Sequence, residues 1–174
     1  MGKYLRAVVI AVGTTITGTS SVSFNNTIDS EATENNDLTV NSPATTFGDA
    51  VGDDNVGATQ PLGNIITDNQ GAADITTLNS ASITTVGDQT YNDAIVLGTS
   101  GTGNATTTVN ANDTSFNNTV DATTAGAEAL VVNSSGGGVT TFGDAATDDN
   151  VGATTALASL LTNADGTTVI NSAS

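Results

Sequence analysis

The chain carries the same long motif twice, and this duplication most strongly limits the folds that it can adopt. SFNNTID at 23–29 returns as SFNNTVD at 115–121, and DDNVGAT at 53–59 returns unchanged at 148–154. The offset between the copies is about 92 residues and rises to about 95, because the second copy carries SSGGGV where the first has SPA. Length changes confined to Gly- and Ser-rich turns are typical of repeat arrays, in which stacked strands keep their register.

The duplication predicts a single β-solenoid over residues 1–174, made of two long repeats at about 1–87 and about 88–174. KYLRAVVI at 3–10 aligns with TYNDAIVL at 90–97, so the opening segment is interpreted as a further copy of the repeat. The alternative is a retained signal peptide, but the apolar run AVVIAV is shorter than such a core requires. No stretch approaches the roughly 20 apolar residues of a membrane-spanning helix, so membrane insertion is not expected.

Composition indicates which kind of repeat array this is. Hydrophobic residues make up 37% of the chain and aromatic residues only 3%, too little bulky apolar surface for an ordinary globular core. The apolar residues occur in short β-branched clusters such as VVIAV, ADITTL and AIVL, separated by turn residues, and strong helix formers are scarce. An all-β solenoid needs only a few inward side chains per coil, since like residues stack in successive coils about 4.8 Å apart.

At roughly 20 to 24 residues a coil, the chain is predicted to form about seven or eight coils. The residues predicted to point inward belong to the two repeats: Val22, Phe24, Ile28, Leu38, Val40 and Phe47 in the first, and Phe116, Val120, Leu130, Val132 and Phe142 in the second.

The charge of the chain restricts its partners. The formal net charge is −16, and Lys3 and Arg6 are the two basic residues. A body without cations offers no phosphate contacts, so no nucleic-acid or anionic-membrane partner is expected. Repulsion between carboxylates must be relieved by salt or bound cations, which suits an extracellular or cell-surface location. Absence of Cys is compatible with secretion.

Two acidic segments, FGDAVGDDN and FGDAATDDN, are the best candidates for a ligand site, and Ca²⁺ is the one possible cofactor that they suggest. Hard oxygen ligands at short spacing in a loop are what Ca²⁺ uses. The spacing matches neither the EF-hand nor the Gly-rich nonapeptide of another β-roll family, which leaves open that the loops are solvated acidic projections. The candidate ligands are Asp49, Asp53, Asp54, Asn55, Asp144, Asp148, Asp149 and Asn150.

The residue types present argue against catalysis. Without His or Cys, the chain has no His-based triad, no thiol nucleophile and no ordinary zinc site, so it is predicted to be non-enzymatic. A glycosidase using two carboxylates is the remaining enzymatic alternative. Its candidate pairs are Asp53 with Asp54, Asp148 with Asp149, and Glu31 with Glu34. Turn residues exposed to solvent are the simpler interpretation of all three pairs, because Asp is common in Gly- and Asn-rich turns.

Segments such as TTFGDAVG and SVSFNNTID resemble the β-strand repeats of very large bacterial exoproteins and filamentous-haemagglutinin-like adhesins. The resemblance covers almost the whole chain but departs from the family pattern at the inserted DDNVGAT loop. It implies a right-handed parallel β-helix that is secreted and displayed at the cell surface as a stalk or adhesive fibre. The partners that it implies are a glycan or protein of a host or a neighbouring cell.

The two ends of the chain are nearly in phase with the repeat. By the alignment, Ser174 is equivalent to Ser82 and Met1 to Asp88. The chain is therefore interpreted either as a segment of a longer array or as a self-assembling filament subunit that stacks head to tail. Both interpretations stay open at the level of the sequence.

Overall fold

The computed structural model describes residues 2–4, 6–49, 54–68, 71, 73–99, 105–144, 149–163 and 165–172. These residues form the strands β1 to β19 and no helix, and every strand pairing is parallel. No described helix is therefore available to cross a membrane. The predicted all-β solenoid is confirmed.

The strands stack into three long faces. Face A consists of β1 (Gly2–Tyr4), β4 (Val22–Phe24), β7 (Ala44–Phe47), β9 (Ile75–Leu78), β12 (Ala94–Leu97) and β15 (Val120–Ala122). Face B consists of β2 (Val8–Ile10), β5 (Ile28–Ser30), β10 (Ser82–Thr84), β13 (Thr106–Ala111), β16 (Ala129–Ser134) and β18 (Ser159–Thr162), with Val56 bridging Ile28 to Ile83. Face C consists of β3 (Thr14–Thr17), β6 (Leu38–Asn41), β8 (Ile65–Asp68), β11 (Gln89–Tyr91), β14 (Thr114–Phe116), β17 (Val139–Phe142) and β19 (Thr167–Ile170).

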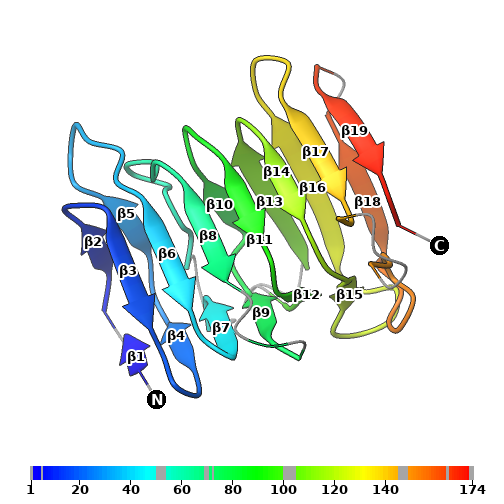
Figure 1. Ribbon diagram of the computed structural model, residues 1–174, viewed down its shortest axis with the longest axis horizontal. Coiled ribbons are helices and arrows are strands. Elements are labelled where there is room, and N and C mark those ends of the chain that lie inside the picture. The colour runs from blue at the N-terminus through cyan, green and yellow to red at the C-terminus, as the bar shows by residue number, and fades with distance from the viewer. Residues whose placement is uncertain are drawn as a thin grey trace.

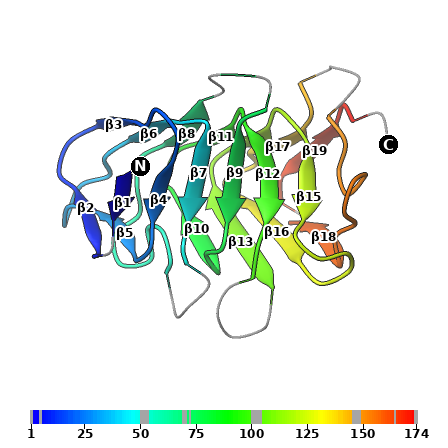
Figure 2. The same cartoon turned by 90° about the horizontal axis from the view of Figure 1, so that it is seen from below.

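The chain winds through faces A, B and C in that order as a right-handed helix. Figure 1 shows the strands of face C running down the front while the chain advances from left to right. Figure 2, seen from below, shows the strands of face A running away from face C toward the back. A path down the front and backward underneath, combined with an advance to the right, is right-handed. This agrees with the handedness implied by the sequence resemblance.

The number of coils is smaller than predicted. The seven strands of face C define about six turns, whereas about seven or eight coils were expected. The reason is that one turn of the solenoid contains more residues than expected. Hydrogen bonds between equivalent corner positions join residues 24 to 27 apart, at or above the upper limit of the expected 20 to 24. The additional residues lie in the corners, which lengthen without disturbing strand register.

Every residue predicted to point inward is buried, with an exposed fraction of 2% or less. Alternation of buried and partly exposed positions along β4, β6 and β16 explains this result, because successive side chains of a strand point to opposite sides. Aromatic rings stack between turns. Phe24 lies on Phe47, and Phe116 lies between Tyr91 and Phe142, with ring centroids 5.1 to 5.4 Å apart.

The two repeats occupy different faces of the solenoid. β4 and β7 lie on face A, whereas β14 and β17, their equivalents in the second repeat, lie on face C. Likewise β6 lies on face C and its equivalent β16 on face B. One repeat therefore spans a non-integral number of turns, and the second copy is turned by one face relative to the first. The duplicated surface features consequently point in different directions around the axis.

Side-chain oxygens of Asp and Asn join neighbouring turns where the chain enters face C. Oδ1 of Asp37 accepts a hydrogen bond from the backbone N–H of Asn64, and Oδ1 of Asn64 accepts one from the N–H of Asp88. In the next turns, the N–H of Asp113 donates to Oδ1 of Asp88, and the N–H of Val139 donates to Oδ1 of Asp113. We call this column the Asx ladder. Much of the acidic character of the chain thus serves to pair backbone donors at corners, which explains how the fold tolerates so many carboxylates.

Candidate functional site

The two acidic segments match in the residues that the structure describes, one segment leaving face A and the other leaving face C. In the first loop, Oδ2 of Asp54 accepts a hydrogen bond from the N–H of Asp49 at 2.9 Å. In the second, Oδ2 of Asp149 accepts one from the N–H of Asp144, also at 2.9 Å. A glycine with φ of 83° precedes both Asp49 and Asp144. This left-handed conformation starts the loop, and glycine adopts it without steric cost.

The structure separates the predicted Ca²⁺ ligands into different environments. Asp54 and Asp149 are buried and turned back onto their own loops, whereas Asp49 and Asp144 are exposed. Oδ1 of Asn55 accepts a hydrogen bond from the N–H of Ser82, which ties the loop to the next turn.

Three further parts of the calcium prediction have separate outcomes. Asn150 is half-buried beside Asp149. Asp53 and Asp148 lie outside the described residues. Among the residues that the structure does describe, no three acidic side chains gather closely enough to hold a metal ion. Calcium binding by these loops stays a prediction.

The carboxylate pairs considered for glycoside hydrolysis do not form a described site. Glu31 and Glu34 are both exposed on the turn after β5, where the N–H of Glu34 donates to the carbonyl of Glu31. Asp54 and Asp149 are engaged in loop closure, and their predicted partners are not among the described residues. Of these carboxylates, the four that the structure describes line neither of the two pockets described below.

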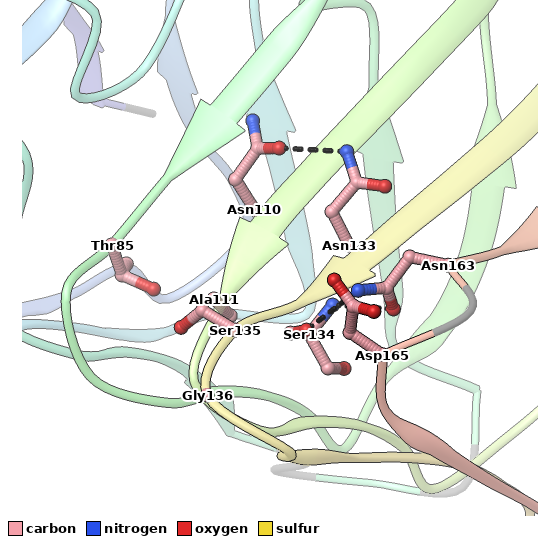
Figure 3. Close-up of a pocket in the computed structure, with 9 residues that line it drawn as sticks. All are labelled: Thr85, Asn110, Ala111, Asn133, Ser134, Ser135, Gly136, Asn163 and Asp165. Atoms are coloured by element: carbon pink, nitrogen blue, oxygen red, sulfur yellow. Dashed lines mark hydrogen bonds between the residues drawn. The ribbon is translucent and has the colours of Figure 1, made fainter.

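A polar pocket of about 350 Å³ lies at the corner between faces B and C, near the ends of β13, β16 and β18. Figure 3 shows its amide and hydroxyl side chains together. Nδ2 of Asn133 donates to Oδ1 of Asn110 at 2.9 Å, and Asn163 forms two hydrogen bonds with the backbone of Ser134. The carboxylate of Asp165 lies beside Asn163 (Figure 3). Such a row of amides, hydroxyls and one carboxylate can form hydrogen bonds with a neutral, hydroxyl-rich ligand.

A second pocket of about 290 Å³ lies at the C-terminal end of the solenoid and is mainly apolar. It is lined by Phe142, Val151, Leu160, Ile170 and Ser172. Leu160 is 39% exposed and Ile170 is 67% exposed. Their equivalents in the first repeat, Ile65 and Leu78, are fully buried under the following turn. The pocket is therefore the hydrophobic core seen in cross-section at its last turn.

Neither the polar pocket nor the Asx ladder was among the sites predicted from the sequence. The ladder has a signal in the sequence, because an Asp or Asn comes directly before the first residue of four successive strands of face C: Asp37, Asn64, Asp88 and Asp113. The pocket has no such signal. Its side chains come from four consecutive turns, and only the stacking of those turns brings them together.

Comparison with family models, with curated proteins and with solved structures gives no match to this chain. The β-helical repeat architecture is established by the strand pairing alone. The more specific resemblance to exoprotein and haemagglutinin-like repeats remains a prediction.

Proposed function

We propose that this chain is a non-enzymatic structural segment of a secreted bacterial surface protein, in which the β-solenoid forms a rigid stalk or fibre. The observation that carries the proposal is the stacking of parallel strands on three faces around one hydrophobic core. Such a body resists bending because every turn forms hydrogen bonds with the next, and its length grows with the number of turns.

The charge distribution supports an extracellular setting for this rod. Carboxylates of the Asx ladder and of the acidic loops accept backbone hydrogen bonds, and no lysine or arginine follows Arg6. A strongly acidic surface remains soluble and resists non-specific association, while external salt screens its self-repulsion.

The polar pocket is the best candidate for an adhesive contact with a host or neighbour-cell glycan. Asn110, Asn133 and Asp165 present amide and carboxylate groups in one open depression, and these groups form hydrogen bonds readily with sugar hydroxyls. We expect weak binding at a single site, with avidity arising where many copies are displayed.

A glycan array with the full chain tests the adhesive part of the proposal. Ser135→Trp, which places a ring in the pocket, should abolish any glycan signal. Ala127→Trp, on an exposed turn at the corner between faces A and B, is the matched control and should retain the signal. Binding that survives Ser135→Trp would remove the pocket from the proposal. Rotary-shadowed or negative-stain images of rods with one diameter test the stalk.

The second candidate function is a filament subunit that stacks head to tail, and the exposed core at the C-terminal end favours it. In the first repeat β9 is covered by β12, and Leu78 pairs with Leu97. β19 is equivalent to β9, and β2 resembles β12 in sequence. Strand β2 of a second copy could therefore cover β19 in the way that β12 covers β9 inside the chain. By the same equivalence, Ile10 of that copy would lie over Ile170.

Charge complementarity adds to this second candidate. Arg6 is exposed near the N-terminal end, and the remainder of the solenoid is acidic. Contact between unlike ends therefore places the positive charge against the acidic body, whereas contact between two N-terminal ends opposes like charges. Size-exclusion chromatography with electron microscopy, at low and at millimolar Ca²⁺, separates the two functions: single rods support the stalk, and linear polymers support the filament.

A further inference from the structure

Two aspartates lie one above the other inside the corner between faces C and A. Asp74 comes directly before β9 and Asp93 directly before β12. These strands pair in the register Ala94 with Ile75, so Asp93 follows Asp74 in the adjacent turn. The N–H of Ala94 donates to the carbonyl of Asp74, which fixes this stacking at 3.1 Å.

Both carboxylates are removed from solvent. Asp93 is 1% exposed and Asp74 is 9% exposed. Oδ2 of Asp93 accepts a hydrogen bond of 2.6 Å from the hydroxyl of Thr76, a fully buried residue of β9. Thr76 and Asp74 are two residues apart, so their side chains leave the strand on the same side. The carboxylate of Asp93 therefore reaches into the interior of the turn that holds Asp74.

Several oxygens at this corner lack a partner among the described residues. They are Oδ1 of Asp93, Oδ2 of Asp74 and the hydroxyl oxygens of Thr67 and Thr45. Thr45 pairs with Thr76 across β7 and β9, and the hydroxyl of Thr67 lies close enough to the carboxyl group of Asp93 to lower its pKa. Thr67 is fully buried and Thr45 is 1% exposed, so the corner holds buried hydroxyl oxygens in addition to the two carboxylates.

Burial of two neighbouring carboxylates is costly without a compensating positive charge. No Lys, Arg or His occurs after Arg6, so the chain itself supplies no cation at this corner. The available groups are all oxygens, the ligands that hard cations prefer. Two carboxylates are neutralised by one divalent ion. Ca²⁺ tolerates irregular coordination, whereas Mg²⁺ requires a nearly ideal octahedron.

We propose that Asp74 and Asp93, together with the hydroxyls of Thr67 and Thr76, form an internal binding site for one Ca²⁺ ion. The site is separate from the two acidic loops of the calcium prediction and does not depend on the proposed function. It lies inside the solenoid wall, where a bound ion joins β8, β9 and the entry to β12. Its role is to hold two turns together.

Isothermal titration of the full chain with CaCl₂, after treatment with chelator, tests the site. We expect a high-affinity event that Asp93→Asn weakens at least tenfold, and that Thr67→Val weakens several-fold with little change of volume. Asp88→Asn, which alters a carboxylate of the exposed Asx ladder, is the matched control and should leave this event unchanged. The double variant Asp53→Asn/Asp148→Asn should also retain it, which distinguishes the corner from the acidic loops.

Two outcomes would overturn the proposal. One is the loss of the event in the double loop variant together with its survival in Asp93→Asn and Thr67→Val. The other is the absence of any saturable event at millimolar Ca²⁺, which would mean that the buried pair shares a proton or a water molecule instead. If Asp93→Asn does not fold, Thr67→Val and Asp74→Asn provide the same comparison.

Discussion

The rings of Phe116 and Phe142 stack across adjacent turns of face C, with centroids 5.1 Å apart and an angle of 8° between their planes. Both side chains are buried, and Phe116 also stacks on Tyr91 from the turn before. The aromatic column thus joins three consecutive turns by contact between like residues.

Phe116→Ala should destabilise the chain by roughly 3 to 5 kcal/mol, because it removes a buried ring and leaves a cavity between two others. Phe116→Leu retains most of the volume and should cost less. Chemical denaturation followed by circular dichroism measures both changes. An alanine variant as stable as the parent would show that the column does not contribute to the core.

The Asx ladder should depend on an acceptor oxygen and not on charge. Oδ1 of Asp88 accepts hydrogen bonds from the N–H of Asp113 and from Nδ2 of Asn112, and Asn64 fills the same position one turn earlier with an amide. Asp88→Asn should therefore change the free energy of unfolding by less than about 0.5 kcal/mol. Asp88→Ala should cost about 1 to 2 kcal/mol by leaving the N–H of Asp113 unpaired. Equal effects of the two substitutions would contradict this assignment.

Stability in the presence of chelator should fall as the pH rises from about 4 to about 6. Burial, together with the smaller effect of the charges of Asp74 and Asp68, raises the pKa of Asp93 from its ordinary value of 3.8 to about 6. The hydroxyls of Thr76 and Thr67 oppose the rise. Between these values the folded chain retains a proton that the unfolded chain has lost, so stability present at low pH disappears above pH 6.

The contribution of Asp93 is at most about 3 kcal/mol, since each pKa unit corresponds to about 1.4 kcal/mol. Thermal melts of the parent and of Asp93→Asn across this pH range isolate it, because the other carboxylates titrate in both proteins. Parallel pH profiles would contradict the assignment to Asp93. Saturating Ca²⁺ should flatten the profile of the parent if the internal site is present.

The acidic loops should be closed by one carboxylate each. Asp54→Ala removes the acceptor of the Asp49 N–H and should cost about 1 kcal/mol, as should Asp149→Ala in the second loop. Asp49→Ala, at an exposed position, is the control and should change stability by less than about 0.5 kcal/mol. Urea titration of the three variants gives the comparison, and a larger effect for Asp49→Ala would reverse the assignment.

Calcium binding by the loops is tested separately from their closure. If Asp49, Asp53 and Asp54 bind Ca²⁺, the melting temperature should rise more in CaCl₂ than in NaCl of equal ionic strength. Asp53→Asn should remove that part of the rise that comes from the first loop. Equal shifts in both salts would mean that the salts only screen the charge of the loops and that the loops do not bind Ca²⁺ specifically.

End-to-end association should depend on the exposed core of the last turn. Ile170→Asp places a charge in the apolar pocket and should abolish linear polymers, whereas Thr141→Asp, on the outer side of β17, should leave them unchanged. Arg6→Glu should weaken association more at low salt than at high salt. Sedimentation velocity at high protein concentration measures these effects. A strictly monomeric parent chain would exclude the filament subunit and leave the stalk segment as the proposed function.

Much of the fold could be predicted from the sequence because it follows from local patterns. Residues such as Phe24, Leu38 and Phe142 alternate with Thr, Ser and Asn, and this alternation alone determines which side of each strand is buried. The duplication around DDNVGAT indicated repeats, and the shared turn residues indicated where chain length can vary. The number of coils was overestimated because corner length has no periodic signal.

What the sequence by itself determined is the strand pattern, the inward residues and the unbalanced negative charge, all of which are properties of neighbours along the chain. Only the tertiary structure decided that the second repeat is turned by one face relative to the first. It alone placed Asp93 over Asp74, and brought Asn110, Asn133 and Asn163 to one pocket. The physical reason is that these contacts join residues about one turn or more apart. They depend on the summed lengths of all intervening corners, which no local sequence pattern records.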